Sequence, residues 1–272
     1  MRIAIVAPSC PATEVARAKV DALAARDFPA AELRWHPQCF LRGGHFAGPD
    51  AARADSLVEV ANDPAVDAVW FARGGYGAVR IAGEVLARLG SVAADKRYMG
   101  YSDGGTLLGA FHAAGLGRPT WGPMPQDVLR PGGEAAVARG LGWLLRGDRR
   151  ALEPSVRAGV PRAAFNLTIL AHLMGTPWLP DLSGHELLLE EVSEPTYRFD
   201  RAFGQLAASG LLERSAGLRL GRVNAVVPNE PAFGEEEEEI AQGWCARAGA
   251  AWLGRADIGH DVDNKVVPFG AG

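Results

Sequence analysis

One short motif in this 272-residue sequence has the form that an activated serine requires. Ser102 is the central residue of Gly100-Tyr101-Ser102-Asp103-Gly104, a G-x-S-x-G motif between a predicted strand and a predicted helix. In such a turn the flanking residues must be small, and the serine hydroxyl projects above the edge of the sheet. The N–H groups at the start of the following helix then point toward a developing oxyanion. The motif therefore favours Ser102 as a nucleophile.

A glycine-rich run follows an earlier predicted strand. It reads Arg73-Gly74-Gly75-Tyr76-Gly77. Glycines at these positions permit positive φ angles and let the backbone approach a ligand closely. The run matches neither a Walker A motif nor the G-x-G-x-x-G dinucleotide fingerprint, and no Lys-Ser/Thr pair follows it. It could supply an oxyanion donor or bind a substrate backbone, and a simple tight turn is the structural alternative.

A serine nucleophile needs a base, and the base needs an acid that orients it. Among the six histidines we favour His260, which lies between a predicted loop and the last predicted strand. For the acid, Glu190 and Glu191 stand at the end of the apolar run 187–189. A carboxylate at the end of a buried strand is costly unless it has a partner. Spacing alone does not choose between the two glutamates.

A metal site is the chemical alternative to a serine mechanism. His260, Asp261 and Asp263 could contribute ligands, but no HExxH motif and no second His/Cys cluster completes a site. The three cysteines are widely spaced and include no CxxC pair, which argues against zinc and disulfides and fits a reducing compartment. The sequence therefore predicts neither a metal nor a cofactor.

Composition and charge limit the classes of partner. The formal charge is -4 with both signs scattered along the chain, so the basic stripe of nucleic-acid binding is missing. No stretch approaches the roughly 20 apolar residues of a membrane span. The apolar run 3–7 is too short for the core of a signal peptide, and Pro8 and Pro11 follow it. We therefore expect a small-molecule partner, no nucleic acid and no membrane, with a cytoplasmic location by elimination.

The first half of the chain alternates apolar runs with segments of helical periodicity. Strands are predicted at 3–7, 32–36, 66–72 and 97–101, and helices at 12–27, 50–62, 78–89 and 105–114. Strands that alternate with helices of this length predict a doubly wound parallel sheet. In such sheets a ligand binds beyond the carboxyl ends of the strands.

The second half has shorter strands and a looser pattern. A helix is predicted at 134–145, followed by strands at 186–190, 218–227 and 265–269 and helices at 167–174, 197–209 and 235–248. The polar segment 146–154 between the halves is typical of a linker. We therefore predict an α/β protein with an N-terminal domain at 1–145, a linker at 146–160 and a smaller mixed α/β C-terminal domain at 161–272.

Five blocks, in order along nearly the whole chain, resemble the LD-carboxypeptidase family of serine peptidases. This family includes muramoyltetrapeptide carboxypeptidases and microcin C self-immunity hydrolases. The blocks are IAIVAPS at 3–9, FAG through ARGGYG at 46–77, GYSD at 100–103, LLEEV with EP and YR-x-DR at 188–201, and IGH at 258–260 with Asn264 and Pro268. Together they are far more specific than any one of them.

The resemblance implies a Ser–Glu–His triad, carried onto Ser102, Glu190 and His260. It assigns the acid to the first glutamate of the pair, which spacing left open. It also implies that the nucleophile lies on the N-terminal domain and the acid and base on the C-terminal one. The active site would then be a cleft between the two domains.

Further expectations follow from the same resemblance. The oxyanion donors would be the backbone N–H of Asp103 and one from Gly74–Gly75, with Gly75 favoured. Homodimers are common in such enzymes, although the sequence shows no interface. Trp121 replaces a histidine often found in the family, and Phe165 stands where the family usually has a glycine. Both departures concern the shape of the cleft.

The function that the resemblance implies is removal of the terminal D-alanine from murein tetrapeptides during cell-wall recycling. A muropeptide or a related small peptide would be the substrate. A microcin C-type hydrolase, cleaving the amide of a peptidyl or aminoacyl nucleotide with the same triad, is the close alternative. A catalytically silent muropeptide binder is disfavoured by the intact triad, and a nucleotide-binding module by the missing phosphate-binding lysine.

Overall fold

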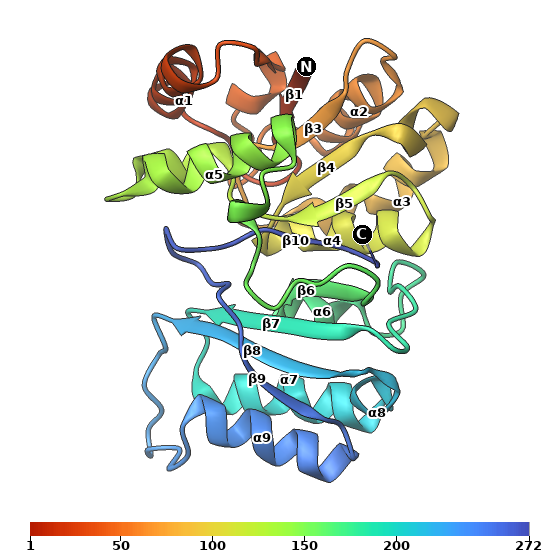
Figure 1. Ribbon diagram of the computed structural model, residues 1–272, viewed down its shortest axis with the longest axis vertical. Coiled ribbons are helices and arrows are strands. Elements are labelled where there is room, and N and C mark those ends of the chain that lie inside the picture. Colours follow the sequence, from red (N-terminus) through yellow and green to blue (C-terminus); the bar gives the residue numbers. More distant parts are fainter. Residues whose placement is uncertain (272) are drawn as a thin grey trace.

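Two β-sheets, each with its own helices, make up the protein (Figure 1), whose computed structural model describes residues 1–271. The first sheet has the order β10-β5-β4-β3-β1-β2, and the second has the order β6-β7-β8-β9. Neighbouring strands run parallel except for β10 with β5. The predicted α/β class and the parallel first sheet are thereby confirmed.

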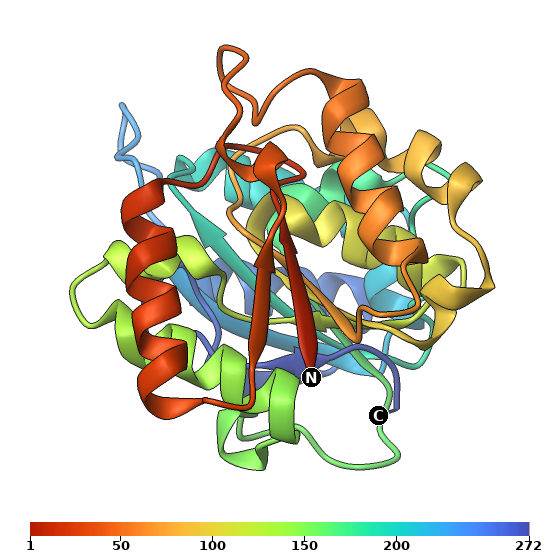
Figure 2. The same ribbon diagram turned by 90° about the horizontal axis from the view of Figure 1, so that it is seen from above.

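The first sheet carries helices on both faces (Figure 2). Its strands are β1 (Arg2–Val6), β2 (Glu32–Trp35), β3 (Ala68–Phe71), β4 (Arg97–Gly100), β5 (Arg118–Trp121) and β10 (Val267–Pro268). One face is covered by α1 (Glu14–Asp27) and α5 (Gly133–Arg146), and the other by α2 (Asp50–Asn62), α3 (Ala78–Arg88) and α4 (Gly105–Ala113).

Strand β1 shows why its sequence is apolar after its first residue, the exposed Arg2. Side chains alternate between the two faces of a strand. Ile3 and Ile5 pack in the apolar cluster that includes α1 and α5, whereas Ala4 and Val6 pack in the cluster on the opposite face. Residues 3–6 are buried on both faces and therefore include no polar residue, which is the pattern that predicts a parallel sheet.

The second sheet has helices on the face that points away from the first unit (Figure 1). Its strands are β6 (Arg162–Asn166), β7 (Glu186–Val192), β8 (Gly217–Asn224) and β9 (Trp252–Arg255). The helices of this half are α6 (Leu167–Leu173), α7 (Thr196–Ala208), α8 (Leu211–Arg214) and α9 (Glu237–Ala248), of which α7, α8 and α9 lie on that outer face.

The final strand differs from the sequence-based expectation. The sequence predicts a strand at 265–269 in the C-terminal half, whereas β10 pairs with β5 of the first sheet, with Val267 opposite Trp121. Residues 161–272 therefore do not all stay with the second sheet. The chain crosses back to the first unit just after His260, so this crossing segment places His260 between the two units.

The two units share one hydrophobic core. A single cluster of buried side chains extends from the first sheet to the second. Helix α4 packs so closely on the second unit that a Cβ at Gly109 would lie 3.1 Å from Leu173 Cδ1 and 3.2 Å from Phe165 Cε1. This apolar packing fixes the orientation of one unit on the other.

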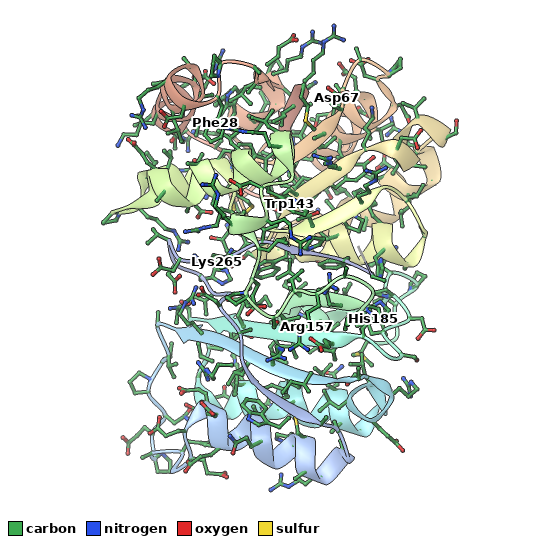
Figure 3. The ribbon with its side chains drawn as sticks, in the orientation of Figure 1. Phe28, Asp67, Trp143, Arg157, His185 and Lys265 are labelled. Carbon is green, nitrogen blue, oxygen red and sulfur yellow. The ribbon has the colours of Figure 1, made fainter. Side chains whose placement is uncertain are left out.

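The segment 146–160 is also hydrogen-bonded to the crossing segment. The Ala151 carbonyl accepts from the Val266 N–H at 2.9 Å, and the Glu153 N–H donates to the Val266 carbonyl at 3.0 Å. The buried Glu153 carboxylate accepts from the Asp257 N–H at 3.1 Å. Trp143, Arg157 and Lys265 lie at this junction (Figure 3). Within residues 1–271, no helix has the length and apolarity to cross a membrane.

Candidate active site

Ser102 lies where β4 ends and a 3₁₀ turn, Ser102–Gly104, leads into α4. Its φ of 57° falls in the left-handed region that non-glycine residues rarely adopt. Such a strained turn is typical of a nucleophile elbow. The strand-turn-helix context predicted for the G-x-S-x-G motif is therefore present in the structure.

Packing against Phe71 explains why this motif contains glycines. A Cβ at Gly100 would lie 2.6 Å from Phe71 Cδ2, and a Cβ at Gly104 would lie 3.0 Å from the same atom. Phe71 is the last residue of the neighbouring strand β3 and is fully buried. The two glycines therefore let the turn close over this ring.

Ser102, His260 and Glu190 form a continuous hydrogen-bonded chain. His260 Nε2 lies 2.9 Å from Ser102 Oγ, and His260 Nδ1 lies 2.5 Å from Glu190 Oε2. With its proton on Nδ1, the imidazole donates to the carboxylate and leaves Nε2 free to accept the serine proton. The geometry is that of a nucleophile, a base and an orienting acid.

Glu190 lies in the C-terminal half of β7, two residues before the strand ends, and its side chain is fully buried. The register of β7 against β8 shifts between Leu189 and Glu191, as in a β-bulge. A β-bulge near a functional site changes the direction in which the side chains of the strand point. Glu190 Oε1 is buried and has no hydrogen-bond partner among residues 1–271. The carboxylate therefore contacts His260 through its other oxygen, Oε2.

Glu191 faces a different set of partners. Its carboxylate accepts from Asn166 Nδ2 at 2.6 Å, from the N–H and hydroxyl of Thr168 at 2.9 and 2.6 Å, and from the Val192 N–H at 2.8 Å. Burial raises the pKa of Glu191, although these donors oppose the shift. Glu191 thus ties α6 to β7 and does not contact His260.

The backbone around His260 is held by two asparagines. Asn224 Oδ1 accepts from the His260 N–H at 2.8 Å, and Asn264 Oδ1 accepts from the Gly259 N–H at 3.2 Å. The Arg130 guanidinium donates to the His260 carbonyl. Sequence reasoning did not assign a role to Asn224 or Arg130, because neither lies near His260 in sequence and neither has a motif of its own.

Tyr101 forms one wall beside His260. Their ring centroids lie 5.0 Å apart, and the Tyr101 hydroxyl donates to Asp127 Oδ1 at 2.8 Å. Burial raises the pKa of Tyr101 well above its ordinary value, and burial also raises the pKa of Asp127. The phenol therefore stays protonated and keeps its donor to Asp127. Asp127 in turn lies 3.3 Å from Arg130, which holds the His260 carbonyl.

The glycine-rich run lies directly against Ser102. A Cβ at Gly74 would lie 3.0 Å from Ser102 Cβ and 3.1 Å from Ser102 Oγ. Gly75 has a φ of 107°, and a Cβ there would overlap the Cys10 sulfur. The N–H groups of Gly75 and Asp103 donate no hydrogen bond to an acceptor within residues 1–271. Both therefore have a free donor beside the serine.

Asp103 has a second role that the sequence did not indicate. Its buried carboxylate accepts from Ser9 Oγ at 2.5 Å and from the Ala78 N–H at 2.8 Å. Burial raises the pKa of this carboxyl group. The side chain joins the loop after β1 and the first residue of α3 to the serine turn, while the backbone N–H stays available.

The residues weighed as metal ligands have other partners. Asp261 pairs with Arg222 at 2.5 and 2.8 Å, and His260 is engaged with Ser102 and Glu190. Within the described residues, no three His, Cys, Asp or Glu side chains are grouped so that they could hold a metal ion. The chemistry that this arrangement can perform is that of an activated serine.

Comparison with known proteins decides the family. The model of the LD-carboxypeptidase N-terminal domain matches residues 3–120, and that of the LD-carboxypeptidase C-terminal domain matches residues 164–272. The chain belongs to the LD-carboxypeptidase family. It is therefore a hydrolase of the serine peptidase class, as the resemblance predicted.

Relatives of this LD-carboxypeptidase cover most of its length. A murein tetrapeptide carboxypeptidase of Pseudomonas aeruginosa is 30% identical over 294 residues, covering 99% of this chain and 91% of the relative. A putative carboxypeptidase of Streptomyces coelicolor is 36% identical over 237 residues, covering 81% of this chain and 74% of the relative.

Solved structures agree with the fold. The crystal structure of muramoyltetrapeptide carboxypeptidase from Oxalobacter formigenes has a TM-score of 0.79 at 27% identity, covering 98% of this chain and 93% of that one. The microcin C7 self immunity protein MccF has a TM-score of 0.79 at 17% identity, covering 99% of this chain and 91% of that one. The likeness to MccF concerns the fold alone.

The two departures from the family pattern are both buried. Trp121 donates from Nε1 to Asn264 Oδ1 at 2.9 Å, so it holds the same asparagine that binds the Gly259 N–H. Phe165 packs on Phe269 with ring centroids 5.2 Å apart. Trp121 and Phe165 are fully buried, so they act on the site through packing and not as exposed walls.

Replacing Gly75 with alanine should lower kcat of this LD-carboxypeptidase by about 10²–10³-fold, the usual effect of losing one oxyanion donor. The new Cβ would overlap the Cys10 sulfur at a φ of 107°, so the loop and its N–H must move. Gly249→Ala is the matched control, since Gly249 has a φ of 66° with open space around it. Steady-state kinetics would contradict the role of Gly75 if both variants kept wild-type kcat.

Proposed function

We propose that the protein is a serine-type LD-carboxypeptidase that removes the terminal D-alanine from murein tetrapeptides through Ser102, His260 and Glu190. The hydrogen-bonded chain from Ser102 Oγ to His260 Nε2 at 2.9 Å, and from His260 Nδ1 to Glu190 Oε2 at 2.5 Å, carries this proposal. The name of the Pseudomonas aeruginosa relative, a murein tetrapeptide carboxypeptidase, supports the substrate class.

Acylation begins with proton transfer from the serine. His260 Nε2 takes the proton from Ser102 Oγ as this oxygen attacks the carbonyl between an L-centre and the terminal D-alanine. Glu190 holds the imidazole in the tautomer with the proton on Nδ1 and stabilises the imidazolium that forms. The imidazolium then gives its proton to the departing D-alanine nitrogen, and an acyl-enzyme remains on Ser102.

Deacylation repeats these transfers with water. His260 accepts a proton from the attacking water and returns it to Ser102 Oγ as the acyl bond breaks. In both halves the tetrahedral oxyanion would be held by the N–H groups of Gly75 and Asp103, with Gly74 leaving room beside the serine. Each such donor is typically worth about 2.7–4 kcal/mol of transition-state stabilisation.

The proposal also assigns the catalytic residues to two different units. Ser102 follows β4 of the first sheet, and Glu190 lies in β7 of the second. We place the nucleophile on a domain at 1–145, the acid and base on a domain at 161–272 whose last strand, β10, returns to the first sheet, and a linker at 146–160 between them. The site would then lie between the domains, where a change in their orientation would separate the base from the nucleophile.

The place of the reaction in the cell is also proposed. Acting on murein tetrapeptides would put the enzyme in cytoplasmic recycling of cell-wall peptides. A homodimer stays a prediction from the family resemblance. No cofactor has a role in the steps described.

A substrate comparison tests this function. We expect the protein to release D-alanine from muramoyl tetrapeptide, as followed by mass spectrometry. The matched control is the same peptide with a terminal L-alanine, which an LD-specific site should cleave far more slowly. Equal rates on the two peptides would contradict LD specificity.

A third compound separates the close alternative. Aspartyl sulfamoyl adenosine is the ligand seen in a solved MccF complex and represents an aminoacyl-nucleotide amide. Cleavage of this compound without D-alanine release would keep the serine chemistry and replace the proposed substrate. Failure on all three compounds would count against the murein substrate and the nucleotide substrate alike.

A further inference from the structure

His260 lies in a part of the chain that has no regular secondary structure. Residues 256–265, which lead from β9 of the second sheet to β10 of the first, belong to no helix or strand. Such a segment lacks the regular backbone hydrogen bonds of a helix or a sheet, so its backbone groups need other partners. The position of the proposed base therefore depends on the side chains that bond to this crossing segment.

Two arginines of the first unit bond to the carbonyls of the crossing segment. Arg130 donates to the His260 carbonyl. Arg139 of α5 donates to the carbonyls of Val262 at 3.0 Å and Asn264 at 2.8 Å. Within residues 1–271, no other group donates to the His260 carbonyl. The unit that carries the serine turn thus holds three alternate carbonyls of the segment.

The second unit bonds to the same segment through β8. Asn224 accepts from the His260 N–H at 2.8 Å, and Arg222 donates to Asp261 at 2.5 and 2.8 Å. The N–H and the carbonyl of His260 belong to two different peptide planes. With Arg130 on one plane and Asn224 on the other, the direction in which the imidazole leaves the backbone is set by both units.

The Arg130 guanidinium is itself connected to the serine turn. Its Nε lies 3.3 Å from Asp127 Oδ1, and the same oxygen accepts from the Tyr101 hydroxyl at 2.8 Å. Tyr101 directly precedes Ser102 in the sequence. The contacts therefore run from the serine turn through a phenol, a carboxylate and a guanidinium to the backbone of His260.

Burial and further hydrogen bonds fix the members of this chain of contacts. Tyr101 and Asp127 are buried, and Asp127 Oδ2 accepts from the Met124 N–H at 2.8 Å. Burial raises the pKa of Asp127, and the Arg130 charge is the strongest of the effects that oppose this shift. A guanidinium has several donors in fixed directions, so one group can hold a carboxylate and a carbonyl together.

We propose that Arg130 is a positioning residue, which holds the imidazole of His260 against Ser102 from the unit that carries the serine. It acts through the His260 carbonyl and not on the reacting atoms. The inference rests on the proposed serine mechanism and adds to it a contact that crosses between the units. A displacement of about 1 Å in a catalytic group can lower a rate by about 10²-fold, so this contact should matter for the chemical step.

Substrate binding is the alternative role for this arginine. The Arg130 side chain is 38% exposed, and a guanidinium can bind the carboxylate of a peptide. Kinetics separate the two roles. The loss of a positioning contact lowers kcat, whereas the loss of a contact that binds substrate and transition state equally raises KM and leaves kcat unchanged.

Arg130→Met tests the proposal, because it removes every donor and keeps a long side chain. We expect kcat on muramoyl tetrapeptide to fall by about 10²-fold with KM near that of wild type. The rate at which a fluorophosphonate labels Ser102 should fall as well, since labelling needs the same alignment and no peptide substrate. Arg130→Lys keeps a charged donor, so it should recover part of both rates.

A double-variant cycle tests whether the contacts act as one chain. Tyr101→Phe removes the hydroxyl that donates to Asp127 and keeps the ring. It should lower kcat and the labelling rate, but less than Arg130→Met does. In the variant Tyr101→Phe/Arg130→Met the two losses should not add, because both side chains contact the same carboxylate oxygen.

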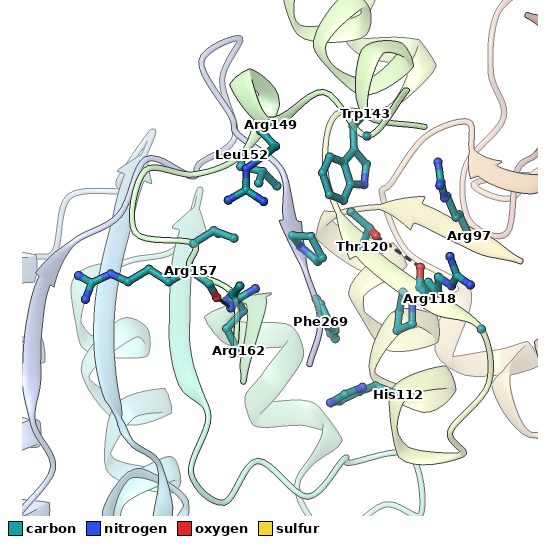
Figure 4. Close-up of a pocket in the computed structure, with 16 residues that line it drawn as sticks. Arg97, His112, Arg118, Thr120, Trp143, Arg149, Leu152, Arg157, Arg162 and Phe269 are labelled. Atoms are coloured by element: carbon teal, nitrogen blue, oxygen red, sulfur yellow. Dashed lines mark hydrogen bonds between the residues drawn. The ribbon is translucent and has the colours of Figure 1, made fainter. Parts of the chain in front are cut away.

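Arg97→Met is the matched control. Arg97 also donates to a backbone carbonyl, that of Leu144. It is the first residue of β4, so it lies at the opposite end of this strand from Ser102, where it lines a separate pocket (Figure 4). We expect Arg97→Met to lower the melting temperature and to leave kcat and the labelling rate unchanged.

Three results would overturn the role of Arg130. These are wild-type kcat and labelling in folded Arg130→Met, a rise in KM alone in that variant, and an equal loss of activity in Arg97→Met. Wild-type rates in Tyr101→Phe would overturn the role of the chain of contacts. A wild-type protein that is labelled at Ser102 without releasing D-alanine would contradict the murein substrate alone, and the labelling rates would still decide the role of Arg130. A wild-type protein that takes up no label would overturn the serine mechanism and this inference together.

Discussion

Replacing Ser102 with alanine is expected to lower kcat on muramoyl tetrapeptide by about 10⁴–10⁶-fold, with little change in the melting temperature. In the proposed mechanism Ser102 Oγ supplies the bond to the acyl group, and no other hydroxyl is bonded to His260 Nε2 within residues 1–271. Alanine keeps the Cβ and removes the one atom that reacts. Steady-state kinetics and a thermal melt on the same preparations measure both effects.

A control variant at a residue that contacts the serine turn distinguishes a loss of catalysis from a loss of stability. Ser9→Ala removes a hydroxyl that donates to Asp103 at 2.5 Å and does not contact His260. It should lower the melting temperature, because Asp103 loses one of two donors while it stays buried. Its kcat should fall far less than that of Ser102→Ala. Comparable losses of kcat in the two variants would contradict the assignment of the nucleophile.

Replacing Glu190 with glutamine should lower kcat by about 10⁴-fold, the loss known for the corresponding aspartate-to-asparagine change in a serine protease triad. The amide can donate to His260 Nδ1, which favours the tautomer with the proton on Nε2. That nitrogen can then no longer accept the serine proton. Glutamine has nearly the same shape as glutamate, so the variant should fold. Activity assays and circular dichroism measure the two properties.

The neighbouring glutamate is the matched control. Glu191→Gln alters a buried carboxylate that has four donors and no contact with His260. The NH2 group of the glutamine would face one of these donors, and two donors cannot form a hydrogen bond with each other. We therefore expect the free energy of unfolding to fall by about 1–3 kcal/mol. The kcat of the folded protein should stay near that of wild type. A larger loss of kcat in Glu191→Gln than in Glu190→Gln would exchange the roles of the two residues.

The serine turn could be predicted from local sequence, because its requirements are local. The motif around Ser102 needs glycines on both sides, and Phe71 shows why they are needed. Strands β1 and β3 were likewise visible as apolar runs, since nearly all of their residues are buried, whereas β2 is a half-exposed edge strand without such a run. In these parts of the chain, neighbouring residues carry enough information to identify the element.

The partners of the serine could not be derived in this way. His260 is 158 residues from Ser102, and Glu190 is 70 residues from His260, so their proximity depends on the packing of two units. Apolar character at the end of β7 pointed to Glu190 and Glu191 equally. Family resemblance chose Glu190, and the hydrogen bonds in the structure distinguish the environments of the two residues.

Several strands escaped prediction for identifiable reasons. Strand β5 begins with Arg-Pro, which is typical of a turn, and β6 follows a polar linker without a clear period. Strand β9 is only partly buried and contains Gly254 at a φ of 90°. The pairing of β10 with β5 depends on contacts across the chain, which strand propensity does not encode.

Covalent labelling tests the central claim most directly. The protein would be treated with a fluorophosphonate, which reacts with activated serines, and the modified peptide would be identified by mass spectrometry. We predict one adduct on Ser102, absent from Ser102→Ala and formed much more slowly in Glu190→Gln. A protein that takes up no label, or takes it up at another residue while Ser102 stays unmodified, would contradict the assignment of Ser102 as the nucleophile.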